Sequence, residues 1–245
     1  MANPKYSIVV PFFNEEGNID TLLAEILQAA GMLGEAEVVA VDDCSNDATL
    51  QKLKTVAAAD ERVRVVHHLS NSGQSAAICT GVDAAIGQWI ITLDGDGQND
   101  PADIPKMVTR IEQSDGLTMV AGHRTKRQDN RLRKFSSRVA NGVRGWMLGD
   151  GTPDTGCGLK VFARDAFMRF PRFNHMHRFL PALVQRDGGI VISEPVNHRP
   201  RTAGVSKYGL WDRLWVGITD IFGVIWLNRR RVYPCAAKEL SNGSD

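Results

Sequence analysis

The sequence predicts an α/β fold in which a mainly parallel sheet is flanked by helices. Between residues 6 and 121, short runs rich in Val and Ile alternate with stretches of helical periodicity. The apolar runs are continuous rather than alternating, which is typical of strands buried on both faces. With 43% hydrophobic and 23% charged residues, the composition is that of a globular chain rather than a disordered one.

The elements of the first half follow in order from these patterns. Turn-forming residues separate the apolar runs, and helical patterns fill the longer intervals between them. Strands are expected at 6–10, 37–41, 63–67, 89–93 and 117–121, and helices at 16–32, from 47, at 75–85 and at 101–113. A strand, a helix and a following strand in this order predict parallel pairing.

The second half is less regular. A basic helical stretch is expected at 131–148, followed by a glycine-rich loop at 149–158. A helix near 178–186, a strand near 190–196 and a helical tail at 208–231 complete the prediction, with a frayed end at 241–245.

Charge divides the chain into two halves, although the net charge is only +1. Residues 1–121 hold 7 Lys and Arg against 18 Asp and Glu, whereas residues 122–245 hold 22 against 10. Carboxylates suit a metal ion and arginines suit phosphates. An acidic half argues against a protein that coats nucleic acid, so no nucleic-acid partner is expected.

The compartment expected from the sequence is the cytoplasm. The first residues contain no long apolar segment of a secretory signal. The four cysteines show no C-x-x-C spacing, so neither a zinc site nor a disulfide framework is indicated. No run reaches the roughly 18–20 apolar residues that span a bilayer.

Polar clusters follow four successive strands of the predicted sheet, and parallel sheets bind ligands at the carboxyl ends of their strands. Asp94 and Asp96 are spaced so that both can face one divalent cation, which could also bridge to phosphates. The clusters therefore predict a site for a nucleoside diphosphate and a metal. They are Pro11–Phe12–Phe13–Asn14–Glu15–Glu16, Asp42–Asp43–Cys44–Ser45–Asn46–Asp47, Asn71–Ser72–Gly73–Gln74 and the acidic loop 94–100.

Two other kinds of site are excluded by the same segments. The dinucleotide-binding pattern G-x-G-x-x-G is missing after the first strand. A calcium loop of the EF-hand type fails at 94–105, because Asn99 replaces the required glycine and Pro105 stands where the bidentate Glu belongs.

Taken together, these residues resemble the dolichol-phosphate mannose synthase-like (polyprenyl-phosphate glycosyltransferase) branch of glycosyltransferase family 2, over about residues 6–232. The resemblance implies a GT-A fold, a nucleotide-sugar donor, a polyprenyl-phosphate acceptor and inversion at the anomeric carbon. It rests on VVPFFNEE (9–16), VDDCSNDAT (41–49), NSGQSAA (71–77), LDGDGQNDP (93–101), GHR (122–124), RKFSSRVAN (133–141), DTGCGLKVF (154–162) and HRPRTAGVSKYG (198–209).

The resemblance also implies roles for individual residues. Nucleotide-binding positions are Pro11, Asn14, Glu16, Asp42, Asp43, Asn71, Gln74 and Asp94, and the ligands of Mg²⁺ or Mn²⁺ are Asp94, Asp96 and Gln98. Catalysis would involve Asp96 together with the phosphate-binding Arg124, Arg133 and Arg201, and Arg133, Arg201, Ser206 and Lys207 would hold the acceptor phosphate. Mannose from GDP-mannose is the preferred donor.

The acceptor class is also argued from chemistry. A hydroxyl acceptor requires a general base, yet the stretch 174–178 holds two histidines and no carboxylate. A phosphate monoester is already ionised near neutral pH, so sugar transfer to it requires positioning of the phosphate rather than its deprotonation. His175 or His177 as base, a hydroxyl acceptor on a polysaccharide or glycolipid, and a non-catalytic nucleotide-sugar-binding protein stay open as alternatives.

The expected organisation is a GT-A catalytic domain at 1–209, with a nucleotide-sugar half at 1–122 and an acceptor half at 123–209. An amphipathic helix follows at 210–232 and a tail at 233–245. Aromatic and aliphatic residues recur in the helix at helical spacing, and Trp favours membrane interfaces, so the helix is read either as interfacial or as packed on protein. The corresponding expectation is a peripheral position on the cytoplasmic membrane face. The expected protein partners are a second copy of the chain (a homo-oligomer) or an integral membrane protein.

Overall fold

The computed structural model describes residues 4–124, 145, 151–200 and 210–230, with the backbone alone for 210–218. The predicted helix at 131–148 therefore lies almost wholly outside the described residues. None of the helices in these ranges is long and apolar enough to cross a membrane.

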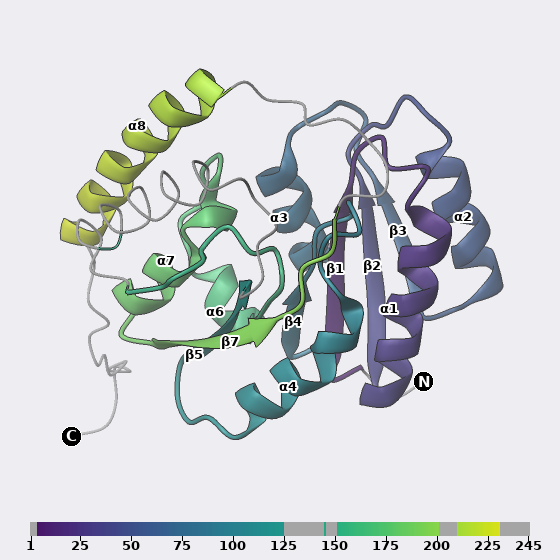
Figure 1. Ribbon diagram of the computed structural model, residues 1–245, viewed down its shortest axis with the longest axis horizontal. Helices are drawn as coiled ribbons and strands as arrows, with labels where there is room; N and C mark the ends of the chain where they lie inside the picture. The colour runs from purple at the N-terminus through teal and green to yellow at the C-terminus, as the bar shows by residue number, and fades with distance from the viewer. Residues whose placement is uncertain (1–3, 125–144, 146–150, 201–209, 231–245) are drawn as a thin grey trace, which may run out of the picture.

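The described residues form one sheet in the order β3-β2-β1-β4-β6-β5-β7 (Figure 1). Every neighbouring pair is parallel except those of β6, which runs antiparallel to both β4 and β5. The mainly parallel sheet is thus confirmed. Its strands are β1 (Tyr6–Phe12), β2 (Ala36–Asp42), β3 (Val63–His67), β4 (Trp89–Thr92), β5 (Thr118–Arg124), β6 (Lys160–Ala163) and β7 (Ile190–Val196).

Strand β6 and the short helix α6 (Arg164–Met168) that follows it are not among the elements expected from the sequence. The strand has a local explanation. Its four residues follow a glycine-rich stretch and are too few to show a period. It is placed in the sheet by its partners, since Val161 pairs with Ile91 of β4 on one side and Val120 of β5 on the other.

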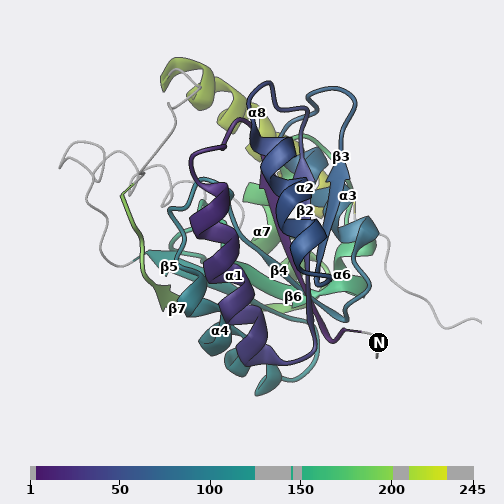
Figure 2. The same ribbon diagram turned by 90° about the vertical axis from the view of Figure 1, so that its right-hand side faces the viewer.

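Helices cover both faces of the sheet (Figure 2). On one face lie α1 (Ile19–Leu33), α2 (Thr49–Ala59), the short η1 (Pro101–Asp103) and α4 (Ile104–Glu112); on the other lie α3 (Gln74–Ala84), α6 (Arg164–Met168), η2 (Met176–Arg178) and α7 (Leu180–Arg186). Ile8 and Val10 of β1 join the first core, and Val9 joins the second. All three are fully buried, as predicted for strands covered on both faces.

Several helix boundaries differ by a few residues from the predicted ones, and two of these differences have clear local reasons. The first helix begins at Ile19 rather than 16, because residues 14–16 bond to the loop after β2. The segment 101–113 divides into η1 and α4, and the Asp100 carboxylate accepts a hydrogen bond from the N–H of Ala102 to start it.

The last described helix, α8 (Leu210–Arg229), lies outside the sheet and packs on α7 (Figure 1). The contact is small: Val224 is buried against Phe179 and Ala182. The C-terminal helix expected from the sequence is present, and among its described side chains, 219–229, only that of Val224 is buried.

Candidate active site

The four predicted polar clusters lie at one rim of the sheet. The parallel strands β1, β2, β3 and β4 all end there, and β5 and β7 end on the same side. Because β6 is antiparallel, its first residue, Lys160, begins at that rim as well. The fold therefore brings the acidic clusters, Arg124 and the segment after β7 to one edge.

Asn14 and Glu16 bind the loop that follows β2. The side-chain oxygen of Asn14 accepts a hydrogen bond from the N–H of Asn46 at 2.7 Å, and that of Glu16 accepts one from Ala48 at 2.8 Å. Asn14 and Cys44 both have positive φ angles, 54° and 59°, which is uncommon for residues other than glycine. The two loops are thus held in a fixed and locally strained shape, as is frequent at functional sites.

Asp42 is completely buried at the end of β2. Its Oδ2 accepts hydrogen bonds from the ring of His67 at 2.8 Å and from the N–H of Ser45 at 3.3 Å. Its Oδ1 is buried and has no hydrogen-bond partner among the described residues. An acceptor of this kind is costly to bury unless something donates to it.

Asp43, by contrast, is occupied by the protein itself. Its carboxylate accepts four hydrogen bonds: from the N–H groups of Ser72 and Gly73, both at 2.8 Å, from the amide of Asn71 at 3.1 Å and from the ring of His68 at 2.7 Å. Asp43 and Asn71 therefore shape the loop before α3.

Asp94 and Asp96 stand on the loop after β4, and Asp94 is bound closely. Gln74, the first residue of α3, donates to Asp94 Oδ1 at 2.8 Å. A Cβ atom on Gly158 would lie 2.3 Å from the same carboxylate, so that position leaves room for hydrogen only. Burial and the negative charge of Asp96 raise the pKa of Asp94 to about 6.

The rest of this loop is fixed by its neighbours. Asp96 Oδ1 accepts from the N–H of Gln98 at 3.1 Å. The backbone oxygen of Gln98 accepts from the N–H of Arg199, which joins the loop to the segment after β7. A Cβ on Gly95 would lie 2.5 Å from the backbone oxygen of Pro11, so the first predicted cluster touches the acidic loop.

These residues fit a divalent cation. Two neighbouring carboxylates supply hard oxygen ligands, and a bound cation would offset both the burial and the repulsion by Asp96 that raise the pKa of Asp94. No cluster of three or more His, Cys, Asp or Glu side chains suited to a metal occurs in the described ranges. Mg²⁺ commonly needs only one or two carboxylates when phosphate oxygens and water complete its shell.

Arg124, at the end of β5, is held in a bidentate ion pair. Its Nε and Nη2 donate to the two oxygens of Asp154 at 2.6 and 2.7 Å, and both side chains are largely buried. Asp154 thereby fixes the direction of the guanidinium at the rim. The other predicted phosphate-binding residues, Arg133, Arg201, Ser206 and Lys207, lie outside the described residues.

The segment leading to position 201 is itself anchored on the rim. Arg199 donates to Glu25 at 2.7 Å and to Asp100 at 2.6 Å, and the N–H of Asn197 donates to Asp103 at 2.6 Å. The acceptor-half motif 198–209 therefore starts beside the acidic loop.

Lys160 is a site residue that sequence reasoning missed. It is buried, its ammonium donates to the backbone oxygen of Cys157, and burial lowers its pKa although Asp94 and Asp154 oppose that shift. The lysine is visible in the sequence as part of the motif DTGCGLKVF. Its position near Asp94 follows only from the antiparallel placement of β6, which the sequence does not show.

The two histidines of the 174–178 stretch are each engaged by the protein. His175 donates from Nδ1 to Asp220 of α8 at 3.0 Å, and a hydrogen bond of 2.7 Å joins His177 Nδ1 to the hydroxyl of Ser75. Burial, with Arg178 and Lys160 nearby, lowers the pKa of His177 well below its usual value. Asp220 could not be foreseen here, because it lies 45 residues further along the chain.

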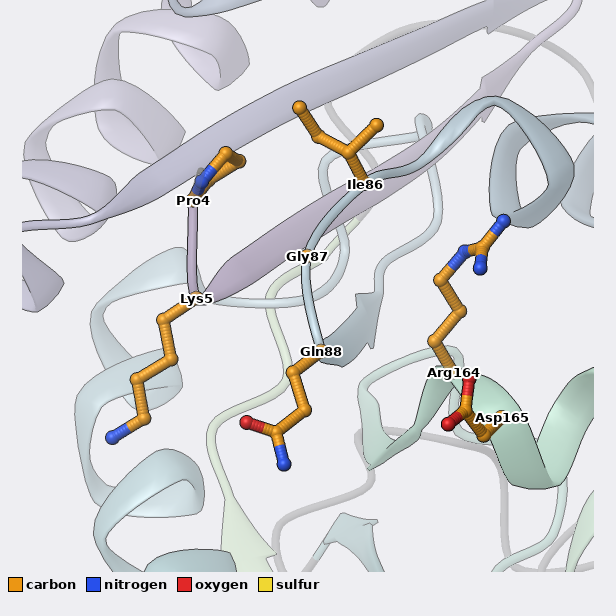
Figure 3. A pocket seen from close by; sticks show the side chains of 7 residues that line it. All are labelled: Pro4, Lys5, Ile86, Gly87, Gln88, Arg164 and Asp165. Atoms are coloured by element: carbon orange, nitrogen blue, oxygen red, sulfur yellow. The ribbon is translucent and has the colours of Figure 1, made fainter. Parts of the chain in front are cut away.

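A hollow at the opposite end of the sheet holds none of the predicted site residues (Figure 3). It is lined by residues 4–5, 86–88 and 164–165. Its two cationic side chains already have partners, since Lys5 bonds to Glu112 and Arg164 to the carbonyl oxygens of Val82 and Asp83. The candidate site is therefore the carboxyl-end rim.

Known structures share this fold. A mannosyltransferase from Pyrobaculum calidifontis, solved with GDP-Man and Mn²⁺, superposes with a TM-score of 0.67 at 20% identity, covering 96% of this chain and 67% of that one. Glucosyl-3-phosphoglycerate synthase from Mycobacterium tuberculosis, solved with Mn²⁺, UDP-Glc and phosphoglyceric acid, gives 0.64 at 18% identity, covering 93% and 80%. The predicted GT-A fold is confirmed.

Curated relatives are more similar in sequence. The dodecaprenyl-phosphate galacturonate synthase of Rhizobium johnstonii is 39% identical over 238 residues, covering 93% of this chain and 68% of the relative. The undecaprenyl-phosphate 4-deoxy-4-formamido-L-arabinose transferase of Pectobacterium atrosepticum is 35% identical over 205 residues, covering 82% and 62%. This chain thus matches about two thirds of the length of these relatives.

The family model described as glycosyl transferase family 2 matches residues 7–170. That range includes the four polar clusters, Arg124 and Lys160, and so contains most of the described rim. The chain belongs to glycosyl transferase family 2.

Proposed function

We propose that this chain transfers a sugar from a nucleotide sugar to a polyprenyl phosphate, with inversion at the anomeric carbon and with Mg²⁺ or Mn²⁺ as cofactor. The observation that carries the proposal is the carboxylate pair Asp94 and Asp96 at the rim, held there by Gln74 and Gly158. The names of the two curated relatives, both polyprenyl-phosphate sugar transferases, support the acceptor class.

The donor side of the reaction requires stabilisation of a leaving diphosphate. A divalent cation held by Asp94 and Asp96 would act as a Lewis acid on the charge that develops there. Arg124 adds a guanidinium whose direction Asp154 already fixes, so little reorganisation is needed when charge develops.

The acceptor side needs no general base if the nucleophile is an ionised phosphate oxygen. His177, whose lowered pKa leaves it neutral, is bonded to Ser75, and His175 is bonded to Asp220. These contacts support a transfer in which cationic residues position the acceptor. A hydroxyl acceptor would instead call for a base free to take its proton.

The sugar proposed first is galacturonic acid. The mannose preference drawn from the sequence is not confirmed, because the curated relatives are named for galacturonate and 4-deoxy-4-formamido-L-arabinose. The mannosyltransferase from Pyrobaculum calidifontis, at 20% identity, supports the fold alone.

Transfer to defined acceptors tests the function. The protein is incubated with Mn²⁺ and a panel of UDP-galacturonate, UDP-4-deoxy-4-formamido-L-arabinose, UDP-glucose and GDP-mannose, with a short polyprenyl phosphate or the matching polyprenol as acceptor. We expect a glycosyl phosphate product, identified by mass, with the phosphate acceptor only. Transfer to polyprenol at a comparable rate would contradict the base-free reaction, and no transfer from any donor would contradict the proposal.

We further propose that α8 lies on a lipid surface. Phe222 and Trp226, one helical turn apart, expose 61% and 60% of their surface, and Arg229 and Arg230 follow them. Exposed aromatic residues beside cations are typical of helices that bind anionic interfaces. The same helical spacing in the sequence includes Ile225, which is partly buried, and Trp211, Leu214, Trp215 and Ile218, whose side chains lie outside the described ones.

Replacing Phe222 and Trp226 together by serine should therefore weaken binding to vesicles. We expect the double variant to lose at least tenfold in affinity in flotation with vesicles of phosphatidylcholine and phosphatidylglycerol. The control is Leu69→Ser, which removes an apolar side chain that is 93% exposed on the loop after β3. Equal flotation of the double variant and the wild type would show that α8 does not bind lipid through this face.

A further inference from the structure

We propose that His177 is a positioning residue for the donor site: through Ser75 it fixes the first turn of α3, and this turn holds Gln74 against Asp94. The inference rests on the proposed function, because it assigns to Asp94 a role in binding the metal and diphosphate. It adds a residue from the 174–178 stretch, which belongs to the acceptor half of the chain.

The connection consists of two short hydrogen bonds and one turn of helix. His177 Nδ1 lies 2.7 Å from the hydroxyl of Ser75, and Gln74 Nε2 lies 2.8 Å from Asp94 Oδ1. Gln74 and Ser75 are the first two residues of α3, after Gly73 with a φ of 86°. The N-cap residue, Gly73, has no side chain to cap the helix, so the position of this end depends on the hydrogen bonds that Asp43 accepts from the N–H groups before it and on contacts such as that of Ser75.

A second contact aligns the same face of α3 with η2. Cys79 and Met176 are buried with their sulfur atoms 3.5 Å apart. Ser75 and Cys79 are four residues apart and therefore lie on one side of the helix. The η2 segment thus touches α3 at two successive turns, and the hydrogen bond is at the turn nearer to Asp94.

The segment that carries His177 is itself held from the other side. His175 has a φ of 64°, an unusual value for this residue, and it bonds to Asp220 of α8 at 3.0 Å. Anchored between α3 and α8, the segment cannot shift easily, which is what a positioning role requires.

The protonation state of His177 agrees with this role. Its pKa is lowered by burial and by the neighbouring cations Arg178 and Lys160, so the ring is neutral near pH 7. A neutral ring has one acceptor nitrogen, and the Ser75 hydroxyl can donate to Nδ1. The ring is then engaged in holding Ser75.

Binding of UDP and GDP in the presence of Mn²⁺, measured by calorimetry on the full chain, tests the inference independently of turnover. We expect His177→Ala and Ser75→Ala each to weaken nucleotide binding by about five- to tenfold, the size of one lost hydrogen bond. The double variant should be no weaker than either single variant, because both remove the same contact.

Two further substitutions at position 177 separate positioning from base catalysis. The side-chain amide of Asn reaches the place of Nδ1 and can accept from Ser75 but has no basic nitrogen, whereas the amide of Gln reaches further. We expect His177→Asn to bind nucleotide and transfer sugar within about threefold of the wild type, and His177→Gln to resemble His177→Ala. Normal nucleotide binding by His177→Asn with a thousandfold loss of transfer would overturn the inference in favour of a base.

Cys79→Ala is the matched control, since it loosens the same η2–α3 contact away from Gln74. We expect a lower thermal midpoint with unchanged nucleotide binding; an equal loss of binding would show that general packing, not the His177–Ser75 bond, is responsible. Wild-type binding by both alanine variants would refute the inference alone. Failure of the wild type to bind either nucleotide would refute the proposed function as well.

Discussion

Replacing Asp96 by asparagine is expected to reduce sugar transfer by at least three orders of magnitude. The substitution keeps the shape of the side chain and removes one of the two charges proposed to hold the metal on the diphosphate. A thousandfold loss corresponds to about 4 kcal/mol of transition-state stabilisation, within the several kcal/mol that a metal ion supplies to such a reaction. Initial rates over a range of Mn²⁺ concentrations measure the effect.

Two comparisons make this result specific. Calorimetric titration with Mn²⁺ and UDP should show weaker metal-dependent binding, because the charge is lost in the ground state too. The control is Asp115→Asn, which removes an exposed carboxylate from the loop before β5, away from the rim. Full activity of Asp96→Asn would contradict the role of Asp96, and full activity in the presence of a chelator would contradict the metal assignment.

Most of the sheet could be predicted because short stretches of the sequence are enough to identify its strands and the helices between them. The strands β1, β2 and β4 consist largely of continuous apolar runs, and the helices between the first four strands fix parallel pairing. The rim followed from that topology, since parallel strands end on one side. Strand β6 could not be predicted in this way, because its only evidence is the pairing with β4 and β5, which are distant in sequence.

The types of residue at the rim could be predicted from the sequence, but the different hydrogen bonding of each residue could not. Asp42 and Asp43 are adjacent and of the same type, and the sequence assigned both to the nucleotide. In the structure one has a buried oxygen without a partner among the described residues, and the other has four donors from the protein. Only the course of the loop 71–73 distinguishes them, and that course is a tertiary property.

Asp43 therefore leads to the largest stability effect that we expect. Replacing it by asparagine should lower the free energy of unfolding by about 3–5 kcal/mol, the range for breaking a buried, hydrogen-bonded charge. An amide has one acceptor oxygen, so its NH₂ group would face the N–H of Ser72 or Gly73, and two donors would be opposed. Urea denaturation of the nucleotide-free protein measures the loss.

A surface carboxylate gives the matched comparison. Asp83 pairs with Arg172, both about two-fifths exposed, so Asp83→Asn should cost at most about 1 kcal/mol. If Asp43→Asn instead unfolds at the wild-type urea concentration but no longer binds UDP or GDP, the carboxylate contacts the nucleotide directly. Loss of stability together with a proportionate loss of binding would instead mean that Asp43 acts by shaping the loop 71–73, from which α3 and Gln74 begin.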